Sequence, residues 1–301
     1  MNATAYASTC EFYRLLRREV STGNSHLSEA QQARLQSHYP IMMAPDRYPE
    51  DLVTTIYASR RAPMVESIRR TEDAVVFDAG CGYGSESFLF AAAGARVLAV
   101  DRSPEQVAIA KSRQPFFEEQ AGASFDIEFL TGDLDAFTPD RSDLSHTWLA
   151  SVLAVVVDQE DLLRRVYRSS RPGGEILITD MNLLNPLFLL REWQRRRRLM
   201  KLSSEFRQHG NFPQMVRRNH RKGARYFETS RGSEADDVQF FYPRTLAKLL
   251  RSTGFEPTPP SFSGFMPPLP LERHDRLERF LARLPLIRRF GYFYLMSARK
   301  T

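Results

Sequence analysis

The segment VVFDAGCGYG at residues 75–84 constrains the fold more than any other part of the sequence. An apolar run ends at Asp78, and glycines follow at alternate positions. Glycines between a strand and a helix let the backbone approach a ligand closely. The next apolar run, residues 95–101, ends at a second carboxylate, Asp101. The pattern therefore predicts a strand, a turn, a helix and a second strand, with a ligand at the turn.

From residue 71 onward, short apolar runs alternate with segments of helical periodicity. The predicted strands are residues 74–79, 95–101, 125–133, 145–152 and 175–182, with a sixth within 256–265 and a last one at 291–300. The predicted helices are residues 85–94, 103–114, 158–174, 241–255 and 272–290. This alternation is typical of right-handed crossovers onto a mostly parallel sheet covered on both faces. It predicts a Rossmann-like α/β fold.

The regions outside this alternation indicate a cap and an insert. Helical patterns in the N-terminal region lie at 9–20, 28–39 and 49–70. The last of them is predicted to be interrupted at Pro63. We therefore predict an N-terminal helical cap at residues 1–70 and a domain at 71–301, with a basic helical lid insert at about 183–237.

The basic character of the chain is concentrated in this insert. Residues 185–232 contain thirteen Lys and Arg and three acidic residues, a net charge of +10. Because the whole chain carries +6, the remainder carries −4. A basic segment of this kind can bind an acidic substrate, RNA or an anionic membrane surface, or form the solvated face of a helix. The acidic remainder argues against nucleic acid as the partner.

The composition favours an intracellular protein. Two cysteines, Cys10 and Cys81, are too few for a disulfide framework, and Cys81 is interpreted as a small packing residue. Apolar stretches do not reach the roughly 18 residues that a transmembrane helix requires. The first residues lack the basic start and apolar core of a secretion signal. We expect a soluble, cytoplasmic protein without a transmembrane segment.

Two kinds of ligand compete for the glycine turn. A dinucleotide requires the pattern G-x-G-x-x-G, in which the third glycine lets helix and strand pack closely. Here Ser85 occupies that third position. Asp78 also places a negative charge toward the site of a pyrophosphate. Both features favour a ligand with a cationic end.

Residues 75–84 resemble the first motif of class I S-adenosylmethionine-dependent methyltransferases. The resemblance implies that the turn holds the methionine part of the cofactor, with Asp78 near its amino group. Asp101 matches the acidic residue that accepts hydrogen bonds from both ribose hydroxyls. TGDLDAF at 131–137 resembles the third-strand motif, in which Asp133 accepts from the adenine amino group.

The resemblance covers roughly residues 71–182 and 238–300 and implies S-adenosyl-L-methionine as the cofactor. Arg102 is expected along the adenine, and the Leu134 backbone is expected at the edge of the ring. A Pro-Gly-Gly turn before the fifth strand follows the family order. Asp135 is interpreted as a solvated loop residue. The cofactor-binding residues implied are Asp78, Gly80, Cys81, Gly82, Gly84, Asp101, Arg102, Asp133, Leu134 and Ala150.

The acceptor is less constrained, because methyl transfer mainly requires positioning. Many small-molecule members of the family have histidines after the fourth strand, where this chain has Ala154 and Val155. Two weak candidates for a catalytic residue are His209 in the insert and Tyr13 in the cap. The fourth strand ends without a carboxylate, so we predict no metal site. We expect O- or N-methylation of a small molecule, an acidic metabolite or a biosynthetic intermediate.

Three other functions remain open at this stage. The first is an RNA methyltransferase that uses the basic insert. The second is an enzyme that uses the same cofactor for alkyl transfer or cyclisation and releases methylthioadenosine. The third is a non-catalytic partner subunit. The sequence carries no signal of an oligomeric state.

Overall fold

The computed structural model describes residues 3–44, 50–186, 224–229, 235–265 and 289–301, with Phe280, Leu281, Leu284 and Ile287 besides. Most of the predicted lid insert lies outside the described residues. The same is true of most of the predicted helix at 272–290. Among the helices that are described, none is both long and apolar enough to cross a membrane.

The N-terminal region forms three helices, as its pattern predicts. They are α1 (Ala3–Thr22), α2 (Glu29–His38) and α3 (Glu50–Arg69). A capping box starts α2: the Ser28 side chain accepts from the Gln31 backbone amide, and the Gln31 side chain accepts from the Ser28 amide. The predicted interruption at Pro63 is wrong, because α3 continues through it. Burial of Met64 and Val65 in the core offsets the helix bond that a proline removes.

The rest of the chain alternates strands and helices. The elements are β1 (Val75–Ala79), α4 (Ser85–Ala92), β2 (Arg96–Asp101), α5 (Pro104–Ala121), β3 (Ile127–Thr131), β4 (Leu144–Ala150), α6 (Gln159–Ser169), β5 (Ser170–Met181), β6 (Ala224–Thr229), β7 (Ala235–Phe240), α9 (Pro243–Ser252), β8 (Phe255–Pro257), β9 (Ser261–Ser263) and β10 (Phe293–Lys300). The predicted sixth strand is thus two short strands, β8 and β9.

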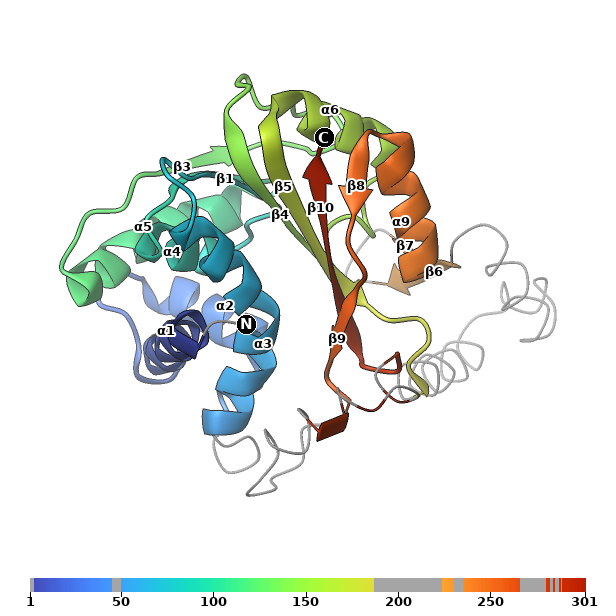
Figure 1. The fold of residues 1–301 in the computed structure, drawn as a ribbon. Coiled ribbons are helices and arrows are strands. Elements are labelled where there is room, and N and C mark those ends of the chain that lie inside the picture. The colour runs from blue at the N-terminus through green and yellow to red at the C-terminus, as the bar shows by residue number, and fades with distance from the viewer. Residues whose placement is uncertain are drawn as a thin grey trace.

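The strands form one eight-stranded sheet in the order β3-β2-β1-β4-β5-β10-β8, with β9 beside β10 (Figure 1). Strands β1 to β5 pair in parallel, whereas β10 is antiparallel to β5 and β8. The order reverses between β1 and β4, which is where ligands bind in sheets of this type. Strands β6 and β7 pair with each other in a separate antiparallel ribbon. The prediction of a helical insert is therefore wrong for residues 224–229 and 235–237, which hydrogen-bond between strands instead.

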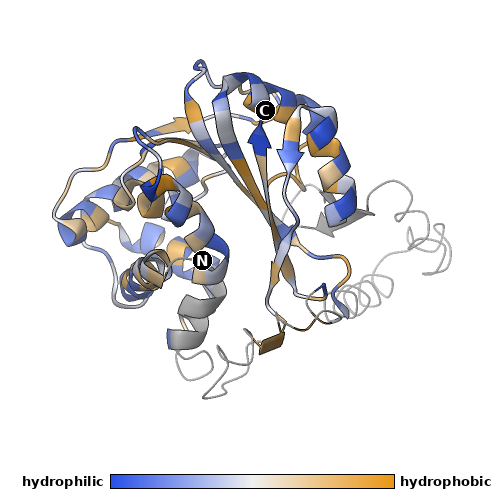
Figure 2. Ribbon diagram, viewed as in Figure 1, coloured by the Kyte–Doolittle hydropathy of each residue, from blue (hydrophilic) through white to orange (hydrophobic). Residues whose placement is uncertain are grey.

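Each face of the sheet carries its own hydrophobic core. On one face α1, α3, α4 and α5 pack against side chains that include Val76, Ala99 and Trp148. On the other face α6 and α9 pack against side chains that include Phe77 and Ile178. Figure 2 shows the central strands mainly in the hydrophobic colour and much of the outer helix surface in the hydrophilic one. The predicted α/β architecture with both faces covered is confirmed.

The Pro-Gly-Gly segment differs from its prediction. The helix predicted at 158–174 ends at Ser169, and the Pro-Gly-Gly segment belongs to β5. The register between β4 and β5 shifts between Leu144 and His146, so β5 has extra residues there. Gly173 has a φ of +73° within this irregularity. The irregular backbone of the Pro-Gly-Gly segment is therefore a bulge at the start of β5, not the end of α6.

Candidate functional site

Asp78 lies near the carboxyl end of β1, where every residue is buried. Its side chain accepts a hydrogen bond of 2.5 Å from the Ser87 hydroxyl at the start of α4. Burial, with additions from the negative charges of Glu86 and Asp101, raises the pKa of Asp78 to about 7. The carboxyl group is therefore poised to ionise when a positive charge is placed beside it.

The glycine turn follows directly and needs its glycines. Gly80, Gly82 and Gly84 have φ angles of +79°, +54° and +78°. A Cβ atom on Gly80 would lie 2.2 Å from a methyl group of Val152, a residue that follows β4. On Gly84, a Cβ would lie 3.0 Å from Phe129. The backbone of the turn is thus held in a conformation, and at a closeness to its neighbours, that a larger residue does not permit.

Cys81 is buried in this turn, in keeping with its interpretation as a packing residue. Its backbone amide and that of Gly80 donate to the Val100 carbonyl at 3.0 and 2.7 Å. Burial raises the pKa of the Cys81 thiol. The thiol is therefore protonated and unsuited to act as a nucleophile.

Asp101 lies at the end of β2, directly beside the turn. One carboxylate oxygen accepts from the Gly82 amide and the other from the Ser103 amide, both at 2.9 Å. The side chain is half-buried. Because an ionised carboxylate has about four acceptor positions, two of them remain for a ligand. The structure thus brings Asp78, the glycine turn and Asp101 together at one edge of the sheet.

The loop after β3 lies at the same edge and is fixed by backbone contacts. Asp133 is exposed, and its side chain accepts from the Asp135 amide at 3.0 Å. The carbonyl of the buried Leu134 accepts a hydrogen bond of 2.7 Å from a guanidinium nitrogen of Arg165. The sequence suggested that Asp135 is a solvated loop residue, but its side chain also makes hydrogen bonds within the protein. Its side chain accepts from the amides of residues 157 and 158 at 2.8 and 3.3 Å, which ties this loop to the one after β4.

The two remaining predicted residues flank this edge. Arg102 is exposed on the loop after β2. Ala150 is the last residue of β4 and is half-buried. Val152, which sequence reasoning missed, packs over Gly80 just beyond it. Its packing closes one side of the turn.

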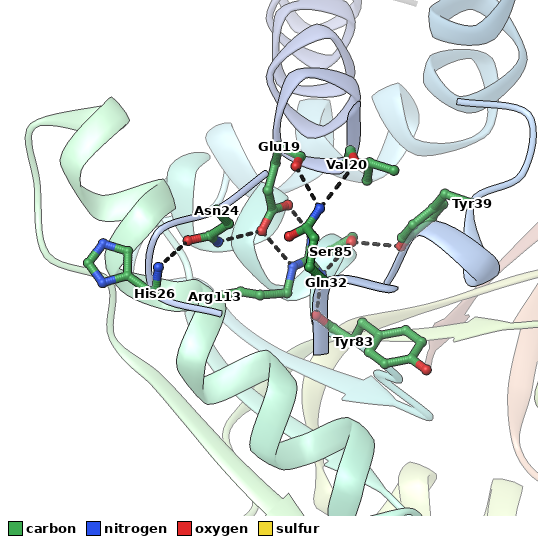
Figure 3. A network of polar contacts seen from close by, with 9 residues as sticks. All are labelled: Glu19, Val20, Asn24, His26, Gln32, Tyr39, Tyr83, Ser85 and Arg113. Atoms are coloured by element: carbon green, nitrogen blue, oxygen red, sulfur yellow. Dashed lines mark hydrogen bonds and ion pairs between the residues drawn. The ribbon is translucent and has the colours of Figure 1, made fainter. Parts of the chain in front are cut away.

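The cap is joined to the glycine turn by a buried ion pair. Arg113 of α5 donates to both carboxylate oxygens of Glu19 in α1, at 2.9 and 2.6 Å, and both side chains are fully buried. The same guanidinium donates to the Tyr83 carbonyl and, at 3.1 Å, to the Ser85 hydroxyl. The Ser85 hydroxyl also lies 2.7 Å from the Tyr39 hydroxyl (Figure 3). The serine that replaces the third glycine of a dinucleotide motif therefore serves to dock the cap.

A second buried ion pair lies between α3 and α4. Arg61 donates to one oxygen of Glu86 at 3.0 and 2.5 Å, and Tyr13 donates to the same oxygen at 3.3 Å. Burial alone would raise the pKa of Glu86, but the Arg61 charge and hydrogen bonds hold it below its ordinary value. Burial raises the pKa of Tyr13 well above its ordinary value. The candidate Tyr13 is thus a neutral donor, and His209 lies outside the described residues.

The contacts that sequence reasoning missed leave one recognisable signal. In α1, Glu19 stands in the same stripe as the buried Leu16 and Val20. In α5, Arg113 continues the buried stripe of Ala110 and Phe117. A charged residue within an apolar stripe requires a partner of opposite charge. The partner itself, far away in the sequence, is visible only in the fold.

Comparison with known proteins agrees with this geometry. A family model described as a methyltransferase domain matches residues 70–233, more than half of the chain. The cypemycin N-terminal methyltransferase of a Streptomyces species is 33% identical over 113 residues, 36% of this chain and 43% of that protein. The malonyl-[acyl-carrier protein] O-methyltransferase of Salmonella typhimurium is 32% identical over 108 residues, 36% of this chain and 39% of that protein. The chain thus spans less than half the length of these relatives.

Solved structures show the same fold. A S-adenosylmethionine-dependent methyltransferase of Methanosarcina mazei superposes with a TM-score of 0.50 at 18% identity, over 76% of this chain and 93% of that one. At that identity the likeness concerns the fold alone. The family match over more than half of the chain shows the family, and the strand order and the glycine turn between two carboxylates agree with it. The chain belongs to the class I S-adenosylmethionine-dependent methyltransferases.

Proposed function

We propose that this chain transfers a methyl group from S-adenosyl-L-methionine to a small-molecule acceptor. The observation that carries the proposal is the glycine turn with Asp78 behind it and Asp101 beside it, all at the reversal of strand order. By their names, relatives of this chain methylate the N-terminus of cypemycin, act as O-methyltransferases in ubiquinone biosynthesis, or O-methylate malonyl-[acyl-carrier protein]. We propose O- or N-methylation of an acidic metabolite or biosynthetic intermediate.

The described residues fit the cofactor. Asp78 would face its amino group, because a buried carboxyl with a raised pKa gains most from a neighbouring cation. Asp101 would accept from the ribose hydroxyls with its two remaining acceptor positions. Asp133 and the backbone of Leu134 would meet the adenine, with Arg102 along the ring. The turn of Gly80, Cys81, Gly82 and Gly84, with Ala150 beyond it, would surround the methionine part.

The chemistry of the reaction divides between cofactor and chain. When bound, the cofactor supplies an electrophilic methyl carbon. The chain would fix the geometry of approach, and the cap helices, joined to the turn through Arg113 and Ser85, would limit the access of water from their side. A general base is needed only if the acceptor atom carries a proton of high pKa. Tyr13, donating to Glu86, could take this role only as a phenolate, which burial opposes.

Labelled cofactor tests the proposal directly. The protein would be incubated with S-adenosyl-L-methionine labelled in the methyl group and with a cell extract that contains RNA and small molecules, and both by-product and labelled product would be identified by mass spectrometry. Methyl transfer yields S-adenosylhomocysteine and a labelled small molecule. Methylthioadenosine as by-product would instead indicate alkyl transfer or cyclisation. Label in RNA would indicate a nucleic-acid acceptor, and no turnover would indicate a non-catalytic subunit.

Replacing Asp101 by alanine should weaken the binding of S-adenosylhomocysteine by about 1–3 kcal/mol, because hydrogen bonds to a charged group are lost. The substitution also frees the Gly82 and Ser103 amides, which loosens the turn. Calorimetric titration measures the effect. Asp140→Ala, which removes an exposed carboxylate, is the matched control. Equal affinities in both variants would refute the ribose assignment.

Cofactor affinity should depend on pH through Asp78. The charged carboxylate attracts the amino group, so affinity should fall by about tenfold from about pH 7.5 to pH 6, as the group with a pKa of about 7 is protonated. Asp78→Asn should weaken binding and flatten the profile. The stability of the ligand-free protein should change in the opposite direction. Because burial raises the pKa of Asp78 in the folded protein above its unfolded value, the free energy of unfolding should fall as the pH rises from about 4 to 7. A pH profile that is equally steep in Asp78→Asn would contradict this role.

A further inference from the structure

Arg60 in α3 carries a buried charge that forms no ion pair with any carboxylate of the described residues. The side chain is 8% exposed, and its Nε atom is buried without a hydrogen-bond partner. Its guanidinium carbon lies 3.8 Å from the centroid of the Phe293 ring, and the Glu86 carboxylate acts on it without forming an ion pair. The neighbouring Arg61 takes the nearest carboxylate, Glu86. Arg60, Arg61 and Glu86 together therefore carry one uncompensated positive charge.

The position of Arg60 follows from the path of α3 along the sheet. Ser67 of α3 donates to Glu175 at 2.9 Å, near the point where β5 begins to run beside β4 in regular register. About two helical turns earlier, Arg60 stacks on Phe293, which pairs with Met181, the last residue of β5. The helix thus runs antiparallel to β5. It carries Arg60 to the carboxyl edge of the sheet, where parallel α/β sheets bind their ligands.

The sheet presents a second unpartnered polar atom at the same level. The Thr179 hydroxyl is buried without a hydrogen-bond partner. Thr179 pairs with Ala150 at the end of β4 and with Leu295, both of which contact the core on the α3 side. Strand alternation places Thr179 and Met181 on one face of β5. The Thr179 hydroxyl and the Nε atom of Arg60 therefore lie at the same edge, and neither has a hydrogen-bond partner among the described residues.

Buried unpartnered donors are rare and costly, and a buried lone cation is more so. Burial, and then the charge of Arg61, lower the pKa of Arg60 to about 9, as expected for a cation that lacks an anion. In the sheet order, β5 is two strands away from β1, so this edge lies about 10 Å from the glycine turn. That separation places it beside the proposed cofactor site, within reach of an acceptor bound next to it.

We propose that Arg60 and Thr179 bind an oxyanion of the acceptor, a carboxylate or a phosphate. The proposal rests on the proposed methyltransferase function and specifies its substrate class. The guanidinium supplies the charge and paired donors that match an oxyanion, and the Thr179 hydroxyl adds a third donor. An anionic acceptor then neutralises the buried charge, so that the acceptor is selected by the same group that destabilises the empty site.

Inorganic phosphate is the probe for this site. It is titrated calorimetrically into the full chain at constant ionic strength, with saturating S-adenosylhomocysteine present. Arg60→Met should weaken phosphate binding by about tenfold or more, and Thr179→Val by about threefold. Arg69→Met removes an exposed arginine of the same helix and should leave phosphate binding unchanged. The affinity for S-adenosylhomocysteine should stay within about twofold of the wild type in all three variants.

Several outcomes would overturn the assignment. One is that phosphate does not bind the wild type detectably. Another is that phosphate binds the wild type and Arg60→Met with equal affinity. A loss of S-adenosylhomocysteine affinity in Arg60→Met, with competition between phosphate and this ligand, would assign the arginine to the cofactor carboxylate instead. If S-adenosylhomocysteine does not bind the wild type, the proposed function fails, and phosphate titration of the free protein still decides the role of Arg60.

Thermal unfolding separates binding from a structural role. Arg60→Met keeps the length of the side chain and removes the uncompensated charge, so the unliganded variant should unfold at a temperature no lower than that of the wild type. A clearly lower temperature would mean that the stacking on Phe293 stabilises the fold, which would contradict a binding role. Thr179→Val is nearly isosteric and removes the buried hydroxyl, so this variant too should unfold at a temperature no lower than that of the wild type.

Discussion

Arg113→Met should lower the free energy of unfolding by about 3–5 kcal/mol, because it leaves the Glu19 carboxylate buried without its cation. The same substitution removes the donors to the Tyr83 carbonyl and the Ser85 hydroxyl, so the turn loses its contact with the cap. We therefore also expect weaker binding of S-adenosylhomocysteine. Urea unfolding followed by circular dichroism measures the first effect and calorimetry the second.

The double variant Glu19→Leu/Arg113→Met provides the control for charge. It removes both buried charges at once, so it should recover most of the lost stability. Arg164→Met breaks an exposed pair with Glu160 and should change stability by no more than about 0.5 kcal/mol. If Arg113→Met is no more destabilising than Arg164→Met, the cap is not held by this pair.

Gly80→Ala should lower the free energy of unfolding by about 2–5 kcal/mol and abolish measurable cofactor binding. One part of the loss is strain, because the position has a φ of +79°. The other part is the clash of the new Cβ with Val152, only 2.2 Å away. Relief of the clash would move the turn or the loop after β4, and both border the proposed cofactor site.

Two companions separate strain from clash. Gly122→Ala places alanine at a φ of +62° with nothing within 4 Å of its Cβ, so it should show only the strain, about 1–2 kcal/mol. Adding Val152→Ala to Gly80→Ala should restore the part due to the clash. If Gly80→Ala is as stable as Gly122→Ala, the turn accommodates a Cβ atom beside Val152 without a clash, and the account of the turn is wrong.

Local patterns predicted the parallel strands because each of β1 to β5 has its own apolar run, and Ser28 and Ser103 marked the starts of α2 and α5. The prediction erred where a local rule was overruled by packing. Pro63 predicts a break because it lacks a backbone amide hydrogen, yet α3 continues through it and buries Met64 and Val65 against the sheet. The Pro-Gly-Gly segment marks a turn, yet β10 pairs with β5 from Glu175 onward and draws the segment into a bulged strand.

The site was predictable where neighbours in sequence are neighbours in space. Asp78, the glycines and Asp101 belong to one strand-turn-helix-strand unit, so their spacing alone placed them together. Arg60 and Thr179 are far apart in sequence, and their placement at the same edge of the sheet depends on how α3 crosses it. The pairing of Glu19 with Arg113 has the same origin. Long-range contacts of this kind follow from topology, which single-sequence patterns do not specify.

The most direct measurement is calorimetric titration of the wild-type chain with S-adenosylhomocysteine, in parallel with NAD. A methyltransferase with its cofactor site between Asp78 and Asp101 should bind S-adenosylhomocysteine at one site per chain and should not bind NAD. Replacing both aspartates by alanine should abolish the binding of S-adenosylhomocysteine. Heat of binding from NAD and none from S-adenosylhomocysteine would contradict the account.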